Sequence, residues 1–259
     1  MEMNPVELYV EEHGQGTPVV FLHGFPFDHS VWEPMVPLLQ DHSRMILPDL
    51  RGFGRSPVTD NVYSMRLQAE DIARMLDDRK IEKAVLVGHS MGGYVSLAFA
   101  HTFPNRLLGL GLVATHAAAD APERRQTRYK TADSVAHKGA RVVASSMVDT
   151  LTPRQELLQP IRDLILQAHP KGIIGALKGM AERSDMTGDL SRISVPAVVV
   201  MGSSDQLLNK DQVKMMAQML PKGWLVEIPN AGHMLMMEEP QAVADPLRQL
   251  IEMVDPHDK

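Results

Sequence analysis

Short apolar segments alternate with amphipathic ones along most of the chain. Strand-sized apolar runs occur at 18–22, 45–47, 84–87, 107–113, 197–201 and 224–228. An alternating segment at 6–12, followed by Gly14-Gln15-Gly16, predicts a hairpin with the first of these runs. Helical periodicity predicts helices at 31–39, 64–78, 92–103, 210–220 and 241–254. Such alternation predicts an α/β fold with a mostly parallel sheet covered by helices on both faces.

One interval breaks this alternation. Between His116 and Ser191 no strand pattern occurs, whereas helical periods recur at 153–168 and 171–183. About seventy residues are too many for an ordinary loop. We therefore predict a helical cap at 117–190, inserted into a core made of 1–116 and 191–259. The cap is expected to lie as a lid over the C-terminal edge of the sheet, and a helical elaboration without a role in the site is the alternative.

Composition and charge exclude several classes of function. The 259 residues include no cysteine, which rules out disulfides, thiolate catalysis and cysteine-ligated metals. The net charge of -6 and the lack of a basic run argue against a nucleic-acid binder. No apolar stretch is long enough for a membrane span, and the first residues do not resemble a secretory signal. We expect a cytoplasmic protein without a membrane association, either a monomer or a homodimer.

The segment Gly88-His89-Ser90-Met91-Gly92 carries the main chemical signal. It follows the apolar run 84–87 directly and opens a predicted helix, which is the strand–turn–helix context of the G-x-S-x-G nucleophile elbow. So sharp a turn strains the central serine and needs small residues on both sides. The Ser90 hydroxyl is then expected to project from the sheet at a helix N-terminus. A glycine-rich turn with an incidental serine is the alternative interpretation.

Four blocks together make the chain resemble the α/β-hydrolase superfamily, in its esterase, lactonase and epoxide-hydrolase-like branch. They are His23-Gly24-Phe25-Pro26, the segment from Pro48 to Ser56, the elbow, and Ala231-Gly232-His233-Met234. The resemblance covers nearly the whole chain. It implies an eight-stranded type of sheet with the helical lid after the sixth strand. It is much less specific for the substrate, because this fold hosts many chemistries.

The resemblance also implies a base and an acid for Ser90. His233 stands where the family places its base, and Asp205 follows a long strand as the family pattern expects, in the chain order Ser, Asp, His. A serine hydroxyl needs such a base to become nucleophilic. His116 is the rival base and Asp120 a weaker alternative acid, because both follow a strand. Asp49, in an Asp-x-Arg-Gly-x-Gly setting, is interpreted as a loop brace.

An oxyanion hole and a pocket complete the expected site. Acyl transfer needs donors for the tetrahedral oxyanion, and we assign them to the backbone N–H groups of Phe25 and Met91. The pocket is expected to be apolar, with walls from Phe25, Phe27, Trp32, Met91 and Met234, and to prefer short to medium acyl groups. We expect no metal and no cofactor, because no His-x-x-x-His pattern and no complete dinucleotide loop occurs.

These residues predict a serine hydrolase of the carboxylesterase or lactonase type, which uses a small ester or lactone and water. A serine at the elbow argues against epoxide hydrolases and dehalogenases, whose branches use an aspartate there. A cofactor-free haloperoxidase or perhydrolase and a C–C bond hydrolase remain open, since they share the three residues. A small-molecule receptor with a slow triad is the alternative from another class.

Overall fold

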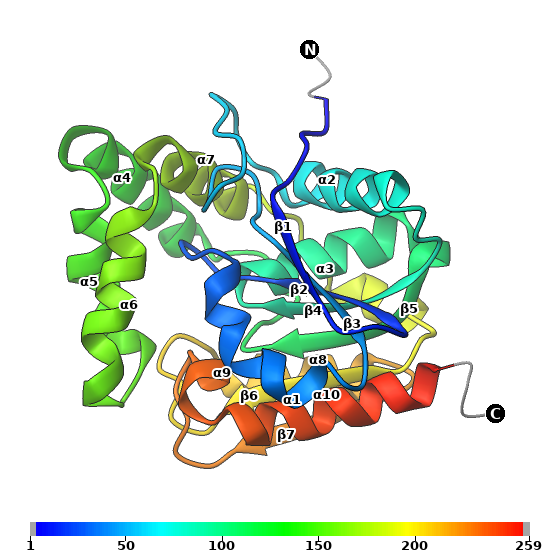
Figure 1. Cartoon of the computed structure of the whole chain (residues 1–259). Helices are drawn as coiled ribbons and strands as arrows, with labels where there is room; N and C mark the ends of the chain where they lie inside the picture. Colours follow the sequence, from blue (N-terminus) through cyan, green and yellow to red (C-terminus); the bar gives the residue numbers. More distant parts are fainter. Residues whose placement is uncertain (1–3, 256–259) are drawn as a thin grey trace.

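A single mixed sheet organises residues 4–255, the part of the chain that this computed structural model describes (Figure 1). The strand order is β1-β3-β2-β4-β5-β6-β7. Strand β1 runs antiparallel to β3, and all other neighbours are parallel. The strands are β1 (Val10–His13), β2 (Pro18–Leu22), β3 (Arg44–Pro48), β4 (Ala84–His89), β5 (Leu107–Val113), β6 (Ala197–Gly202) and β7 (Gly223–Ile228).

Helices cover both faces of the sheet. Helices α2 and α3 pack on one face, and α1 and α10 on the other (Figure 1). The helices are α1 (Val36–Leu39), α2 (Met65–Asp78), α3 (Met91–Thr102), α4 (Pro122–Lys138), α5 (Arg141–Leu151), α6 (Gln155–Gln167), α7 (Pro170–Ala181), α8 (Lys210–Met219), α9 (Leu235–Glu238) and α10 (Pro240–Val254). Short 3-10 helices lie at His29–Met35, Pro104–Arg106 and Thr187–Arg192.

The apolar content of each element explains its depth. All six residues of β4 are buried, as expected of a central parallel strand that helices cover on both sides. Helix α3 is apolar around most of its circumference and lies buried between the sheet and α2. Helix α10 instead presents one apolar stripe to the sheet, including Val243, Leu247 and Leu250, and leaves its other side to solvent.

Two details of the predicted sheet are wrong. The described residues form seven strands rather than the eight-stranded type, so the helical insertion follows the fifth strand, β5, rather than a sixth. The predicted hairpin is also absent from the described residues, because β1 pairs with β3. Both edges of β2 are already occupied by the parallel strands β3 and β4, so β1 adds at the outer edge of β3.

Four helices, α4 to α7, fill the interval between β5 and β6, where the sequence indicated two helical periods. They stand beside the sheet as a separate group, with α4 packed on α7 and α5 on α6 (Figure 1). We call this group the helical insertion. No helix among residues 4–255 is both long enough and apolar enough to cross a membrane.

The turn between β4 and α3 is very tight. Ser90 has φ 51° and ψ -110°, a conformation that non-glycine residues rarely adopt and that costs about 1–3 kcal/mol. A Cβ at Gly88 would lie 2.4 Å from the carbonyl oxygen of Gly92, and one at Gly92 would lie 2.3 Å from that of Leu22. Glycine is therefore required on both sides of Ser90 by close backbone approach.

Gly88→Ala is expected to lower the free energy of unfolding by about 1–3 kcal/mol, because the added methyl overlaps a backbone oxygen in a fully packed region. Urea denaturation measures the change. Gly188→Ala is the matched control, because a Cβ there meets nothing within 4 Å, and its effect should stay within about 0.5 kcal/mol. Equal stabilities of the two variants would contradict the packing argument.

Candidate active site

A chain of hydrogen bonds joins Ser90, His233 and Asp205. The Oγ of Ser90 lies 2.9 Å from His233 Nε2, and His233 Nδ1 lies 2.8 Å from Asp205 Oδ2. Ser90 follows β4, Asp205 follows β6 and His233 follows β7, so three parallel strands, with β5 between the first two, deliver the three side chains to one edge. The structure thus brings together the three residues predicted as nucleophile, acid and base.

The carboxylate of Asp205 sets the tautomer of His233. An ionised carboxylate only accepts hydrogen bonds, so Nδ1 carries the proton and Nε2 is left to accept from the Ser90 hydroxyl. Burial alone would raise the pKa of Asp205. The charge and hydrogen bond of His233 and the Leu207 N–H outweigh burial, so the pKa of Asp205 lies below its ordinary value. The acid is therefore charged at neutral pH.

His233 is also fixed through its own backbone. Its N–H donates to the carbonyl of Leu151 at 2.9 Å, at the end of α5, and its carbonyl accepts from His89 Nε2 at 2.9 Å. Burial, followed by the nearby charge of His233, lowers the pKa of His89 to about 3. His89 is thus a neutral donor.

Glu238 braces the same loop from the other side. Its carboxylate accepts from the N–H of Gly232 at 2.6 Å and from that of Met234 at 3.2 Å. These two residues flank His233, so the loop has little freedom to turn the imidazole. Burial raises the pKa of Glu238. Its place five residues after the predicted base was a signal that the sequence analysis did not use.

The rival base and acid lie in a different network. His116 Nε2 lies 3.3 Å from the hydroxyl of Tyr94, and burial, followed by Arg183, lowers the pKa of His116 to about 4. Asp120 pairs with Arg128 at 2.5 Å and with Arg183 at 2.7 Å. The structure places neither of them in the hydrogen-bond chain of Ser90.

A small pocket of about 40 Å³ opens onto Ser90 and His233. Its other walls come mainly from the helical insertion and from the loop after β6: Phe25, Tyr94, Arg124, Arg128, Met147, Met180, Leu207 and Leu208. Of the five walls predicted from the sequence, the structure places Phe25 in this lining.

The other four predicted walls lie outside the lining of that pocket, packed within the core. Met91, Met234 and Trp32 are fully buried. The Trp32 ring lies edge-on to that of Phe21, with the ring centroids 5.3 Å apart. Phe27 borders a separate cavity of about 460 Å³. Proximity to a motif in the sequence does not fix the direction of a side chain, and the side chains of Trp32, Met91 and Met234 are buried in the core.

Two backbone N–H groups lie beside Ser90 without a protein acceptor. Met91 is the first residue of α3, whose initial N–H groups have no partner within the helix. Phe25 lies in the loop after β2 and lines the pocket with Ser90. Within residues 4–255 neither N–H donates to a backbone or side-chain oxygen. Both are available to an oxyanion.

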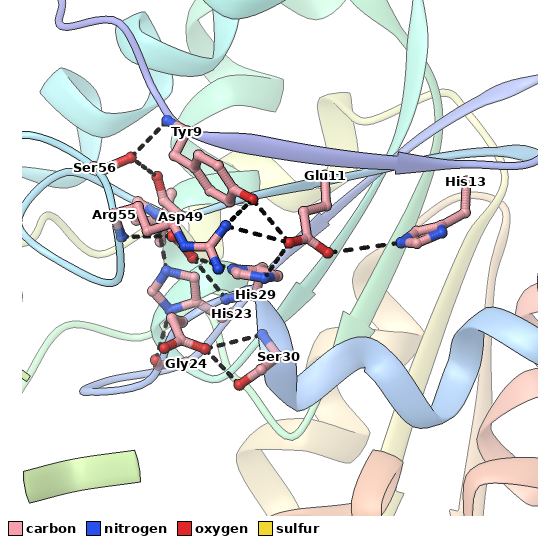
Figure 2. A network of polar contacts seen from close by, with 12 residues as sticks. Tyr9, Glu11, His13, His23, Gly24, His29, Ser30, Asp49, Arg55 and Ser56 are labelled. Atoms are coloured by element: carbon pink, nitrogen blue, oxygen red, sulfur yellow. Dashed lines mark hydrogen bonds and ion pairs between the residues drawn. The ribbon is translucent and has the colours of Figure 1, made fainter. Parts of the chain in front are cut away.

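Asp49 holds the loop that carries Phe25, as the loop-brace interpretation expects (Figure 2). It accepts from the His29 N–H at 2.9 Å and from His29 Nδ1 at 2.6 Å, while its other oxygen accepts from the Arg55 N–H at 2.8 Å. His23 adds a second tie, because its Nε2 accepts from the Leu50 N–H at 2.9 Å. The loops after β2 and β3 are thereby fastened together.

The same cluster contains potential metal ligands. Asp28, His29 and Asp49 place three donor atoms within 4.8 Å of one another. However, His29 Nδ1 and Asp49 already bind each other, and Asp28 accepts from the N–H and hydroxyl of Ser30. All three side chains are thus already engaged in hydrogen bonds within the protein, so we interpret the cluster as a structural brace.

The free energy of unfolding should depend on pH through His29. Its bond to Asp49 raises its pKa above the ordinary 6.5, with a smaller contribution from Glu11. A group whose pKa is raised by folding stabilises the fold fully at a pH below its pKa in the unfolded chain. That stabilisation is lost as the pH rises through its pKa in the folded protein. The free energy of unfolding of the wild type should therefore exceed that of His29→Asn by about 1–3 kcal/mol near pH 6, and by less at pH 9. Urea titrations at several pH values measure the difference, and a constant difference would refute the assignment.

Comparisons with known proteins agree with this architecture. A family model described as the alpha/beta hydrolase fold matches residues 17–240. The solved structure of a thermophilic esterase from Thermogutta terrifontis, with malate bound, is 38% identical and has a TM-score of 0.94, covering 96% of this chain and 94% of that one. A pimeloyl-(acyl-carrier protein) methyl ester esterase from Aeromonas hydrophila is 29% identical, over 95% of this chain and 97% of the relative.

An enol-lactonase from Burkholderia xenovorans shares the fold, with a TM-score of 0.87 at 24% identity, over 94% of this chain and 96% of that one. The family model covers most of the chain, and its matched residues include β2 to β7 and all three residues of the hydrogen-bond chain. The protein belongs to the α/β-hydrolase fold family.

Proposed function

We propose that this protein is a serine hydrolase that cleaves carboxylic esters or lactones through an acyl-enzyme. Ser90 is the nucleophile, His233 the general base and acid, and Asp205 the carboxylate that orients the imidazole. The observation that carries the proposal is the hydrogen-bond chain from Ser90 through His233 to Asp205, on a strained turn at the edge of the sheet. The esterase relatives are consistent with it.

The proton follows the bonds already present. As the Ser90 oxygen attacks the ester carbonyl carbon, its proton passes to His233 Nε2, 2.9 Å away. Asp205 stabilises the imidazolium that forms. The imidazolium then protonates the departing alcohol oxygen, which leaves the acyl group on Ser90. A water molecule, deprotonated by His233, attacks the acyl carbon and releases the acid, and Ser90 regains its proton.

The backbone N–H groups of Phe25 and Met91 form the proposed oxyanion hole. Negative charge develops on the carbonyl oxygen in each tetrahedral intermediate, and prepositioned donors stabilise it without reorganisation. Removing one such donor typically costs about 10²–10³ in rate. The Asp49 and His23 ties described above keep Phe25 in place, so the brace acts on the reaction through the loop rather than by touching the substrate.

The helical insertion is the proposed cap of the pocket. Helices α4, α5 and α7 contribute Arg124, Arg128, Met147 and Met180 to the lining. A cavity of about 40 Å³ holds only a few atoms, so a bulky acyl group requires the cap to move. Segment 117–190 therefore selects the substrate, while the core, 1–116 and 191–259, supplies the chemistry.

Ser90→Ala is expected to lower kcat for p-nitrophenyl butyrate by about 10⁴–10⁶-fold, because the three residues act as a unit. The rate of p-nitrophenolate release measures the loss. Ser191→Ala, which removes an exposed serine hydroxyl in the 3-10 helix Thr187–Arg192, outside the pocket lining, is the matched control for loss of a serine hydroxyl. A rate for Ser90→Ala close to that of wild type would remove Ser90 from the mechanism.

Short acyl groups should be preferred. Across p-nitrophenyl esters from acetate to laurate, we expect kcat/KM for acetate or butyrate to exceed that for laurate by about tenfold or more, because the small pocket has Met147, Met180, Leu207 and Leu208 as walls. Enol-lactones are assayed in parallel. Hydrolysis of none of these substrates would count against the esterase proposal, and a maximum at laurate would show that the cap opens easily.

A further inference from the structure

Three arginines converge on one buried carboxylate beside the active-site pocket. The side chain of Asp120 is fully buried. Its oxygens lie 2.5 Å from Arg128 Nε, 2.7 Å from Arg183 Nη1 and 3.6 Å from Arg124 Nε. Arg124 and Arg128 belong to α4, and Arg183 follows α7, so the cluster joins the two packed helices of the insertion.

The cluster carries a surplus of positive charge. Arginine stays protonated in proteins, so one carboxylate faces three cations. The buried pair of Arg51 and Asp71 elsewhere in the fold is matched one to one. Asp185 lowers the surplus at Arg183, but it lines a neighbouring cavity of about 570 Å³ rather than the pocket with Ser90. The unbalanced positive charge therefore lies mainly on Arg124 and Arg128, the two arginines of α4.

Those two arginines line the pocket together with Ser90 and His233, whereas Arg183 does not. The contacts of Arg183 are structural. Its guanidinium carbon lies 4.1 Å from the centroid of the Tyr94 ring, and its N–H groups donate to the carbonyls of Met180 and Ala118.

Arg124 and Arg128 have N–H donors that lack a strong acceptor. Arg128 Nη1 meets the thioether of Met180, a weak acceptor, at 3.3 Å, and its Nη2 has only a long contact of 3.4 Å with Asp120 Oδ1. The contacts of Arg124, to Asp120 at 3.6 Å and to the carbonyl of Leu207 at 3.4 Å, are long. Strong guanidinium donors are therefore left for a ligand.

The pKa of His116 reflects this positive field. Burial comes first, and Arg183, Arg124 and then Arg128 follow, in lowering the pKa of His116 to about 4. His116 is consequently neutral at pH 7 and adds no competing charge. A pocket that binds only neutral esters does not require two cations with unpaired N–H donors. A planar guanidinium group, by contrast, matches a carboxylate in both geometry and charge.

We propose that the substrate is an ester or lactone that bears a carboxylate a few carbon atoms from the scissile bond, and that Arg124 and Arg128 bind this carboxylate. The inference rests on the proposed function of Ser90, His233 and Asp205, and it names the substrate class of that site. Arg124 and Arg128 are specificity residues, with no part in the transfer of the proton.

Matched substrates test the proposal. The monomethyl and dimethyl esters of succinate, glutarate and adipate share an acyl chain and differ in one negative charge. At pH 7.5, kcat/KM for at least one monoester should exceed that of its diester by about tenfold to a hundredfold, the usual worth of hydrogen bonds to a charged group. The ratio should fall with added salt. Preference for the diester at all three lengths would overturn the proposal.

Two variants on α4 separate binding from nonspecific charge. Arg124→Gln removes a pocket cation, and we expect the monoester-to-diester ratio of kcat/KM to fall by about tenfold or more. Arg125→Gln removes the same charge from an exposed neighbour outside the pocket lining, and the ratio should stay that of wild type. Equal ratios in the two variants would overturn the role of Arg124. Arg128→Lys keeps the charge next to Asp120 and tests the fork geometry, with a predicted fall in the same ratio.

Calorimetric binding of glutarate, compared with pentanoate, separates this inference from the proposed function. Hydrolysis of the diesters with no monoester preference and no glutarate binding refutes the anion site alone. No hydrolysis of any ester, together with glutarate binding that Arg124→Gln abolishes, refutes the esterase proposal and leaves the anion site standing. If the wild-type protein neither hydrolyses an ester nor binds glutarate, the esterase proposal and the anion site are both refuted.

Discussion

The close approach of the β4–α3 turn to the end of β2 is the constraint on which the site depends. The backbone of Gly92 lies against the carbonyl of Leu22, and Ser90 is held at a positive φ between the two elements. The carbonyl of Ser90 accepts from Thr115, and its N–H donates to the carbonyl of Val113 at 2.9 Å, so the neighbouring strand β5 fixes the turn from its other side. The strain persists because the surrounding backbone determines it.

That constraint also explains how the core and the insertion share the site. The core places Ser90, Asp205 and His233 at the carboxyl ends of three parallel strands of one sheet, β4, β6 and β7, a position set by topology. The insertion supplies four of the pocket walls, Arg124, Arg128, Met147 and Met180. Under the proposed function, the chemistry and the choice of substrate therefore lie on different segments of the chain.

Sequence reasoning succeeded where a local pattern determines structure. The apolar run 107–113 is strand β5 with the predicted bounds, and the structure brings Ser90, Asp205 and His233 together. It failed where the outcome depends on distant contacts. The pairing of β1 follows from which strand edges are free, and periodicity indicates a helix at 171–183 without saying that Met180 faces Ser90. The partners of Asp120 come from α4 and from beyond α7, so no local motif reveals the cluster.

The insertion does more than cover the pocket. The carbonyl of Leu151, the last residue of α5, accepts the N–H of His233 and therefore holds the base as well. A movement of the whole insertion away from the sheet would break this bond and release one side of the His233 loop, leaving Glu238 and His89 to hold it. Under the proposed function, movement of α4 and α7, which carry Arg128 and Met180, would open the pocket without breaking this bond, whereas opening at α5 would break it. Under the proposed function, substrate choice and entry therefore lie with α4 and α7, and α5 aligns the proposed base.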